Sequence, residues 1–315
     1  MQYLKLGSSG LSVPRICLGT NNFGGGQIDQ ETCNKIMGRA LDLGMNMFDT
    51  ADCYTKGNSE KIIGQFIKDR REEVIVTTKV GKEFITGEAN PNRLSVSRKN
   101  IIYQLGQSLS RLQTDYVDLY YIHQYDAGVP LVETMKTLDS LVKAGKIRYI
   151  ACSNYSAEQI KESQEIAQKF GLENYIAVQN EYSLFERGIE AEVIPYCLQH
   201  GVGVLAYSTL SGGVLAGRYE SGKSPPQGSR ATYRQPSWWS TMNSVDNFRK
   251  LENVKGAADK AGLRLPVLAI AWVLREQRVA TAVTGASKPE QLEEACKALD
   301  VKLDLQTIDE LNKSM

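Results

Sequence analysis

Two hydrophobic periods alternate eight times along this 315-residue chain. Short apolar and β-branched runs predict buried strands, while stretches with apolar residues three and four positions apart predict amphipathic helices. Strands that alternate with helices form parallel βαβ units, so we predict a (β/α)8 TIM barrel, with a doubly wound open sheet as the alternative. The predicted strands cover residues 15–20, 45–50, 74–80, 116–123, 146–153, 175–180, 202–208 and 279–285. Among the predicted helices are residues 31–44, 95–113, 132–146 and 157–171.

The eight units predict one domain that spans residues 1–315. A length prior of about 150 residues per domain would also allow two, but a barrel of about 250 residues is a single domain. No linker or low-complexity stretch divides the chain. Residues 3–13 predict a β-hairpin that plugs the bottom of the barrel, and a long insertion is expected after the seventh strand, at about 211–245. This insertion combines aromatic residues with basic ones, among them Arg234, Trp238 and Trp239.

Charge and composition exclude several classes of function. The chain has 37 Lys and Arg against 36 Asp and Glu, and a net charge of +1 does not fit a nucleic-acid binder or a polybasic membrane anchor. Only two histidines are present, so we expect no metal site built from several imidazoles.

Cysteine usage and hydropathy indicate the compartment. The six cysteines are scattered without a CxxC pair, which is typical of reduced thiols. The N-terminus lacks the apolar core of a signal peptide, and the apolar run at 267–274 is far shorter than a membrane span. We therefore expect a cytoplasmic protein without membrane or nucleic-acid partners; an oligomer is compatible with the sequence.

Polar residues stand at the ends of three consecutive predicted strands. Asp49 ends the second strand and Tyr54 follows in its loop, while Lys79 and His123 end the third and fourth strands. Each residue alone has an ordinary structural explanation, but the C-terminal strand ends of a barrel together build its active site. We expect the Lys79 ammonium to lower the pKa of the Tyr54 hydroxyl and the Asp49 carboxylate to hold Lys79. With His123 hydrogen-bonded to a carbonyl oxygen, this set suits carbonyl reduction with electrons from a cofactor.

Seven motifs give the chain a resemblance to a known family. They are FDTADCY (48–54), TTK (77–79), YIHQ (121–124), CSNY (152–155), VQNEYS (178–183), AYSTLSGGVLAGRY (206–219) and GASKPEQLEE (285–294). In this order the chain resembles the aldo-keto reductase family over nearly its whole length. The resemblance implies a barrel that binds NADPH, with NADH possible, and reduces a small aldehyde or ketone substrate to an alcohol. It assigns the catalytic tetrad to Asp49, Tyr54, Lys79 and His123, with Tyr54 as proton donor.

The resemblance also implies a set of cofactor contacts. Ser153, Asn154 and Gln179 would bind the nicotinamide carboxamide, and Tyr207 would stack on the ring. The expected mouth residues are Gly19, Thr20 and Asn21 beside Asp49, and the expected pyrophosphate residues are Ser208, Leu210, Gly213 and Arg218. The expected 2′-phosphate residues are Gly285, Ser287, Lys288 and Gln291, with Glu294 facing the adenine amine.

Two residues depart from the family pattern. Thr209 stands where Pro is usual, and Ala295 stands where Asn is usual, so one adenine contact is missing. Because the family includes channel-associated β subunits, the alternative function is a nicotinamide-binding regulatory or sensor protein with weak or no turnover.

Overall fold

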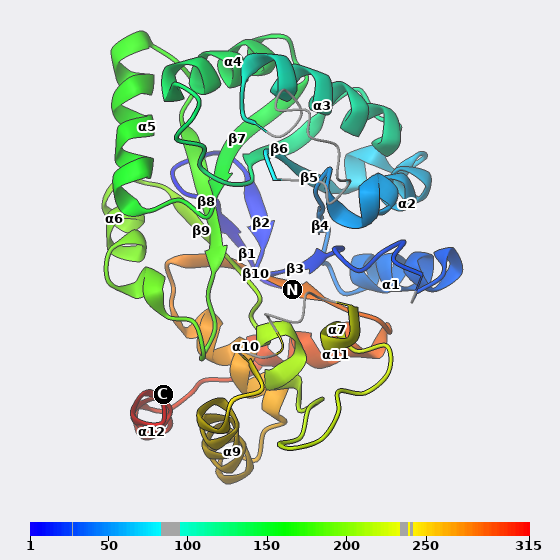
Figure 1. The fold of residues 1–315 in the computed structure, drawn as a ribbon, viewed down its shortest axis with the longest axis vertical. Coiled ribbons are helices and arrows are strands. Elements are labelled where there is room, and N and C mark those ends of the chain that lie inside the picture. Colours follow the sequence, from blue (N-terminus) through cyan, green and yellow to red (C-terminus); the bar gives the residue numbers. More distant parts are fainter. Residues whose placement is uncertain (27, 83–94, 234–238, 240–241) are drawn as a thin grey trace.

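The barrel prediction is confirmed, and the open sheet is excluded. The computed structural model describes residues 1–315 except 27, 83–94, 234–238 and 240–241. Eight parallel strands close into a barrel in the order β10-β3-β4-β5-β6-β7-β8-β9, and helices surround it (Figure 1). Seven of the eight strands lie within the predicted ranges, and β8 extends one residue further, to Glu181. The strands are β3 (Ile16–Gly19), β4 (Met47–Asp49), β5 (Ile75–Val80), β6 (Val117–Ile122), β7 (Ile147–Ser153), β8 (Tyr175–Glu181), β9 (Gly203–Tyr207) and β10 (Val279–Gly285).

The helices between the strands bury one face against the barrel. In α5, for example, the Ser156 hydroxyl accepts a bond from the Gln159 amide and the Gln159 side chain accepts one from Ser156, so a capping box fixes the helix start. The helices in the described part of the chain are α1 (Gln30–Asp42), α2 (Asn58–Ile67), α3 (Arg98–Leu112), α4 (Leu131–Lys143), α5 (Ala157–Phe170), α6 (Val193–Gln199), α7 (Arg230–Tyr233), α9 (Val245–Lys260), α10 (Leu265–Arg275), α11 (Glu290–Cys296) and α12 (Leu305–Lys313).

The N-terminal hairpin closes one end of the barrel, as predicted. Strand β1 (Tyr3–Lys5) pairs antiparallel with β2 (Ser12–Pro14). Leu6 and Val13 are fully buried and belong to the side-chain cluster inside the barrel. Gly7 has a φ of +59° and would place a Cβ only 2.7 Å from the Gly203 nitrogen, where β9 begins. The hairpin therefore lies at the N-terminal ends of the strands and leaves the opposite end open for a site.

The connection between β9 and β10 carries the predicted insertion. It begins with a 3-10 segment, η5 (Ser211–Ala216), and continues through α7 to α9 and α10. The Trp239 ring packs 4.8 Å from that of Tyr219, whereas Arg234 and Trp238 lie outside the described residues. The apolar run 267–274 forms most of α10, and all of its residues are buried. Across the described ranges, no helix combines the length and the apolar character needed to span a bilayer.

Candidate functional site

A cavity of about 510 Å³ opens at the C-terminal ends of the barrel strands. Nearly all of the residues that the sequence analysis assigned to a catalytic or cofactor site line this cavity. Those in its wall are Gly19, Thr20, Asn21, Asp49, Tyr54, His123, Ser153, Asn154, Gln179, Tyr207, Ser208, Leu210, Gly213, Arg218, Gly285, Ser287, Gln291 and Glu294. Lys79 lies buried behind this wall, and the exposed Lys288 side chain is not part of it.

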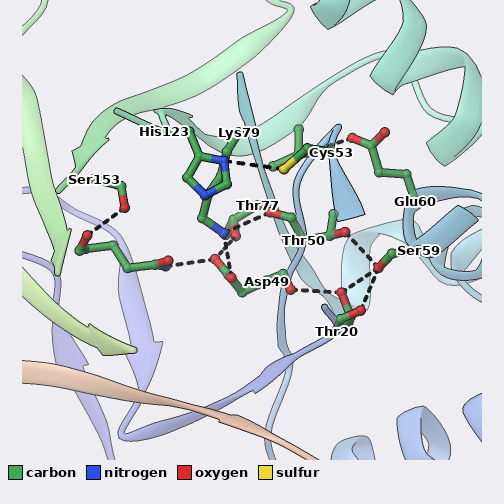
Figure 2. A network of polar contacts seen from close by, with 12 residues as sticks. Thr20, Asp49, Thr50, Cys53, Ser59, Glu60, Thr77, Lys79, His123 and Ser153 are labelled. Atoms are coloured by element: carbon green, nitrogen blue, oxygen red, sulfur yellow. Dashed lines mark hydrogen bonds and ion pairs between the residues drawn. The ribbon is translucent and has the colours of Figure 1, made fainter. Parts of the chain in front are cut away.

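Asp49 and Lys79 form a buried ion pair. The Lys79 Nζ lies 2.6 Å from Asp49 Oδ1, and the two side chains are 0% and 2% exposed. The second carboxylate oxygen accepts bonds from Thr77 Oγ1 at 2.9 Å and Gln179 Nε2 at 2.8 Å (Figure 2). Lys79 also donates to the Thr50 carbonyl at 2.9 Å. Burial disfavours the ammonium, but the interactions with Asp49 and Tyr54 together outweigh burial and raise the pKa of Lys79, so Lys79 keeps its charge.

Tyr54 lies above this pair. Lys79 Nζ is 5.2 Å from the centroid of the Tyr54 ring, and the Tyr54 and His123 rings meet edge to face at 6.0 Å. The predicted lowering of the Tyr54 pKa is wrong in its net direction. Burial raises the pKa of Tyr54 to about 12, because the loss of hydration outweighs the charge and hydrogen bond of Lys79. The hydroxyl therefore keeps its proton at neutral pH.

His123 presents a neutral imidazole to the cavity. Burial, followed by the charges of Lys79 and Lys82, holds the pKa of His123 well below its usual value. Its Nδ1 lies 3.7 Å from Cys53 Sγ, a thiol whose pKa burial raises to about 12. A neutral imidazole carries one N–H donor and one acceptor, so His123 can donate a hydrogen bond to a carbonyl oxygen.

Four residues with amide or hydroxyl side chains, Ser153, Asn154, Gln179 and Tyr207, lie in the cavity wall near His123. Ser153 Oγ donates to the Gln179 carbonyl at 2.7 Å, and Asn154 Nδ2 donates to the His123 carbonyl at 2.9 Å. Asn154 adopts a φ of +60°, a left-handed conformation that Asn tolerates better than most residues. Its Oδ1 accepts a bond from the Tyr207 hydroxyl at 2.7 Å, which ties the end of β9 to that of β7. The structure thus brings the four residues together, as the resemblance implies.

The other end of the cavity reaches the start of α11. Gln291 Oε1 accepts bonds from the backbone nitrogens of Ser287 at 2.7 Å and Lys288 at 3.2 Å. The Arg218 guanidinium contacts Ser287 Oγ at 3.4 Å and so connects the segment after η5 to α11. Hydrogen-bond donors and a cation therefore collect here, where the resemblance expects a phosphate.

The sequence interpretation missed several residues of the wall, and Arg264 is the most informative. Its Nε lies 2.5 Å from Glu294 Oε1, so an ion pair joins the start of α10 to α11 across the cavity. Arg264 is the N-cap of α10 and makes no side-chain cap bond, although Ser, Thr, Asp and Asn are preferred there. This N-cap position is seen only in the folded chain, so the sequence offered no signal for Arg264. Other wall residues that were not assigned to the site include Asn22, Lys82, Glu181, Thr209, Arg230 and Ala295.

A buried network behind the cavity holds the loop that carries Tyr54. Helix α2 follows this loop directly, and its Ser59 hydroxyl lies 2.8 Å from that of Thr20 and 2.9 Å from that of Thr50. The fully buried Glu60 accepts bonds from Thr78 Oγ1 and Arg111 Nε, each at 2.6 Å. Figure 2 shows Ser59 between Thr20 and Thr50, the residues that follow β3 and β4. Together with the bonds of Glu60 to β5 and α3, these contacts hold the start of α2 and so the loop that carries Tyr54.

We predict that Arg111→Met destabilises the fold by about 3–5 kcal/mol, since it leaves the Glu60 carboxylate buried without its cation. Urea unfolding measures the loss. The matched control is the double variant Glu60→Gln with Arg111→Met, which removes both charges and should recover part of the stability. Equal losses in the single and double variants would contradict a role for the uncompensated charge.

The wall fits an elongated ligand with a polar head and anionic groups. Amide and hydroxyl side chains cluster near Tyr54 and His123, and guanidinium groups lie toward α11. Between them, the Asn22 amide donates to the Ala286 carbonyl at 2.9 Å, while its buried Oδ1 has no partner among the described residues and could bond to a ligand. A nicotinamide dinucleotide has this distribution of polar and anionic groups. In the described part of the chain, no group of three or more His, Cys, Asp or Glu side chains could hold a metal ion.

Comparison with known proteins gives two kinds of similarity. The family model described as "Aldo/keto reductase family" matches residues 15–315. A protein of Oryza sativa subsp. japonica named "Probable voltage-gated potassium channel subunit beta" is 36% identical over 305 residues, covering 96% of this chain and 92% of the relative. An Arabidopsis thaliana protein of the same name is 35% identical over 305 residues, with the same coverage of both chains.

Proposed function

The chain belongs to the aldo/keto reductase family, and from this premise we propose that it is an NADPH-dependent oxidoreductase that reduces aldehydes or ketones to alcohols. Family membership supports an oxidoreductase. One observation supports carbonyl reduction in particular. Tyr54 and His123 lie next to each other in the cavity wall, and the Asp49–Lys79 ion pair is buried directly behind Tyr54. That arrangement serves a reaction in which a carbonyl oxygen gains negative charge and then a proton.

In the proposed mechanism, Tyr54 donates the proton and His123 orients the substrate. The pKa of Tyr54 is raised to about 12, so the hydroxyl is protonated when a carbonyl arrives. An alkoxide formed at the substrate is a stronger base than a tyrosinate and takes this proton. The buried Lys79 ammonium stabilises the resulting tyrosinate, and Asp49 keeps the ammonium in place. His123, neutral because its pKa is lowered, donates a hydrogen bond to the substrate oxygen.

We assign the polar residues beside Tyr54 to the nicotinamide and those toward α11 to the phosphates. Ser153, Asn154 and Gln179 offer the donors and acceptors that a carboxamide requires. Arg218 and Ser287 would hold phosphate oxygens. When bound, the nicotinamide supplies a hydride to the carbonyl carbon. All six cysteines are free, which supports our placing the reaction in the cytoplasm.

A second candidate function is favoured by the relatives that are named as potassium channel beta subunits. In that case the chain would bind the cofactor and regulate a partner, with weak or no turnover. One experiment separates the two functions: calorimetric titration with NADPH, followed by its consumption with a panel of aldehydes, sugars, ketosteroids and phosphorylated trioses. Binding with turnover of a panel member supports the reductase, and binding without any turnover supports the regulatory candidate.

Cofactor preference is tested at Lys288. This exposed side chain stands next to Ser287 at the end of the cavity, and we predict that it contacts a 2′-phosphate. Lys288→Ala should weaken NADPH binding about tenfold, equivalent to about 1.4 kcal/mol, with a much smaller effect on NADH. The KM values for both cofactors measure this, with the exposed Lys302→Ala as the control. Equal changes for NADPH and NADH would show that Lys288 makes no such contact.

A further inference from the structure

The cavity wall contains a cation that the proposed cofactor does not use. Lys82 follows strand β5 and lines the same cavity as Tyr54 and His123. Two other cations of the wall lie toward α11: Arg218, which we assign to a phosphate, contacts Ser287, and Arg264 pairs with Glu294. Lys82 therefore adds its charge on the β5 side of the wall, where Tyr54 and His123 lie.

The charge of Lys82 is not neutralised within the described part of the chain. Of the carboxylates in the wall, Asp49 is paired with Lys79 and Glu294 is paired with Arg264. Glu181 ends strand β8, three strands away from β5 around the barrel. No ion pair between described residues includes Lys82, and its side chain is exposed. An exposed ammonium in a cavity is available to an anionic ligand.

Lys82 also lies close enough to act on the reacting groups. Its charge contributes to the low pKa of His123, after burial and Lys79. The same charge acts on the Cys53 thiol, which lies 3.7 Å from His123 Nδ1. A substrate whose carbonyl oxygen approaches His123 therefore lies within the electrostatic reach of Lys82.

We propose that Lys82 determines substrate specificity by binding an anionic group, a carboxylate or a phosphate, on the same molecule as the carbonyl that is reduced. The inference rests on the proposed function of the same cavity. An ammonium recognises such a group as a point charge, without the two-pronged geometry of Arg, so both anions suit it. A charge-assisted hydrogen bond in a partly enclosed site is strong enough to dominate a preference between otherwise similar substrates.

The test compares 4-carboxybenzaldehyde with its neutral analogue, methyl 4-formylbenzoate, using NADPH and the full chain. In Lys82→Met, the ratio of kcat/KM for the charged over the neutral aldehyde should fall about tenfold, the size of one charge-assisted contact. Lys82→Arg should retain the ratio. Lys68→Met, which removes an exposed lysine outside the cavity wall, is the matched control. A third aldehyde, 4-formylphenyl phosphate, shows which anion Lys82 prefers.

A measurement of ligand binding tests the anion site even if the protein reduces neither aldehyde. Calorimetry with 4-(hydroxymethyl)benzoate and NADP⁺-loaded protein should give a Kd about tenfold weaker in Lys82→Met. An unchanged ratio and an unchanged Kd in Lys82→Met overturn the inference, even where both aldehydes are reduced. Absence of turnover with a Kd that still depends on Lys82 supports the anion site but contradicts the reductase. Absence of both turnover and Lys82-dependent binding contradicts both.

Discussion

Tyr54→Phe is expected to lower kcat for carbonyl reduction by about 10²–10⁴-fold, the range that a positioned general acid contributes. The substitution removes only the hydroxyl, whose pKa burial raises to about 12 and which therefore holds the proton to be donated. The phenyl ring should still pack beside His123, so the cavity keeps its shape. Binding of NADPH should change little, since the residues assigned to the cofactor are untouched. Steady-state kinetics and a calorimetric Kd measure the two effects separately.

The matched control for this variant is Tyr120→Phe. Tyr120 is also a buried tyrosine of the barrel, and its hydroxyl has no hydrogen-bond partner in the described part of the chain. It lies outside the cavity wall, so removal of its hydroxyl should leave kcat near that of the natural protein. Full activity in Tyr54→Phe would exclude Tyr54 as the proton donor and leave the reaction to another acid.

Lys79→Met is expected to cause both a loss of stability and a loss of activity. The substitution leaves the Asp49 carboxylate 2% exposed and without its cation, which should lower the free energy of unfolding by about 3–5 kcal/mol. Activity should fall as well, because a tyrosinate at position 54 would no longer be stabilised by a neighbouring ammonium. Urea unfolding and kcat at a temperature where the variant stays folded measure the two losses.

The double variant Asp49→Asn with Lys79→Met separates these effects. The amide oxygen introduced at position 49 can still accept bonds from Thr77 Oγ1 and Gln179 Nε2, and no charge remains buried, so part of the stability should return. Activity should not return, because the ammonium is still missing. Recovery of activity together with stability would show that Lys79 has only a structural role.

The barrel and the set around Tyr54 could be predicted because both follow from local order along the chain. Asp49, Lys79 and His123 lie at or next to the C-terminal ends of β4, β5 and β6, and closure of the barrel brings these ends to one rim. Pairings between distant segments could not be predicted in the same way. Glu60 and Arg111 lie 51 residues apart, and only the packing of α2 on α3 brings them together.

The pKa of Tyr54 shows where reasoning from neighbours fails. The sequence indicates the Lys79 cation, but it does not indicate how completely the fold removes water from the hydroxyl, and that loss of hydration dominates. Arg264 and Lys82 were missed for a related reason. Their residue types suit many positions, and only the three-dimensional arrangement puts both in the wall of one cavity.

The most direct test of carbonyl reduction at this site follows a deuterium atom. NADPH labelled at the transferable position of the nicotinamide is mixed with the protein and 4-nitrobenzaldehyde, and the product alcohol is analysed by mass spectrometry. We predict one deuterium on the carbinol carbon for each NADPH consumed, and essentially no product with Tyr54→Phe. Tight binding of NADPH without any labelled alcohol, across the whole carbonyl panel, would contradict a reductase and favour the regulatory function.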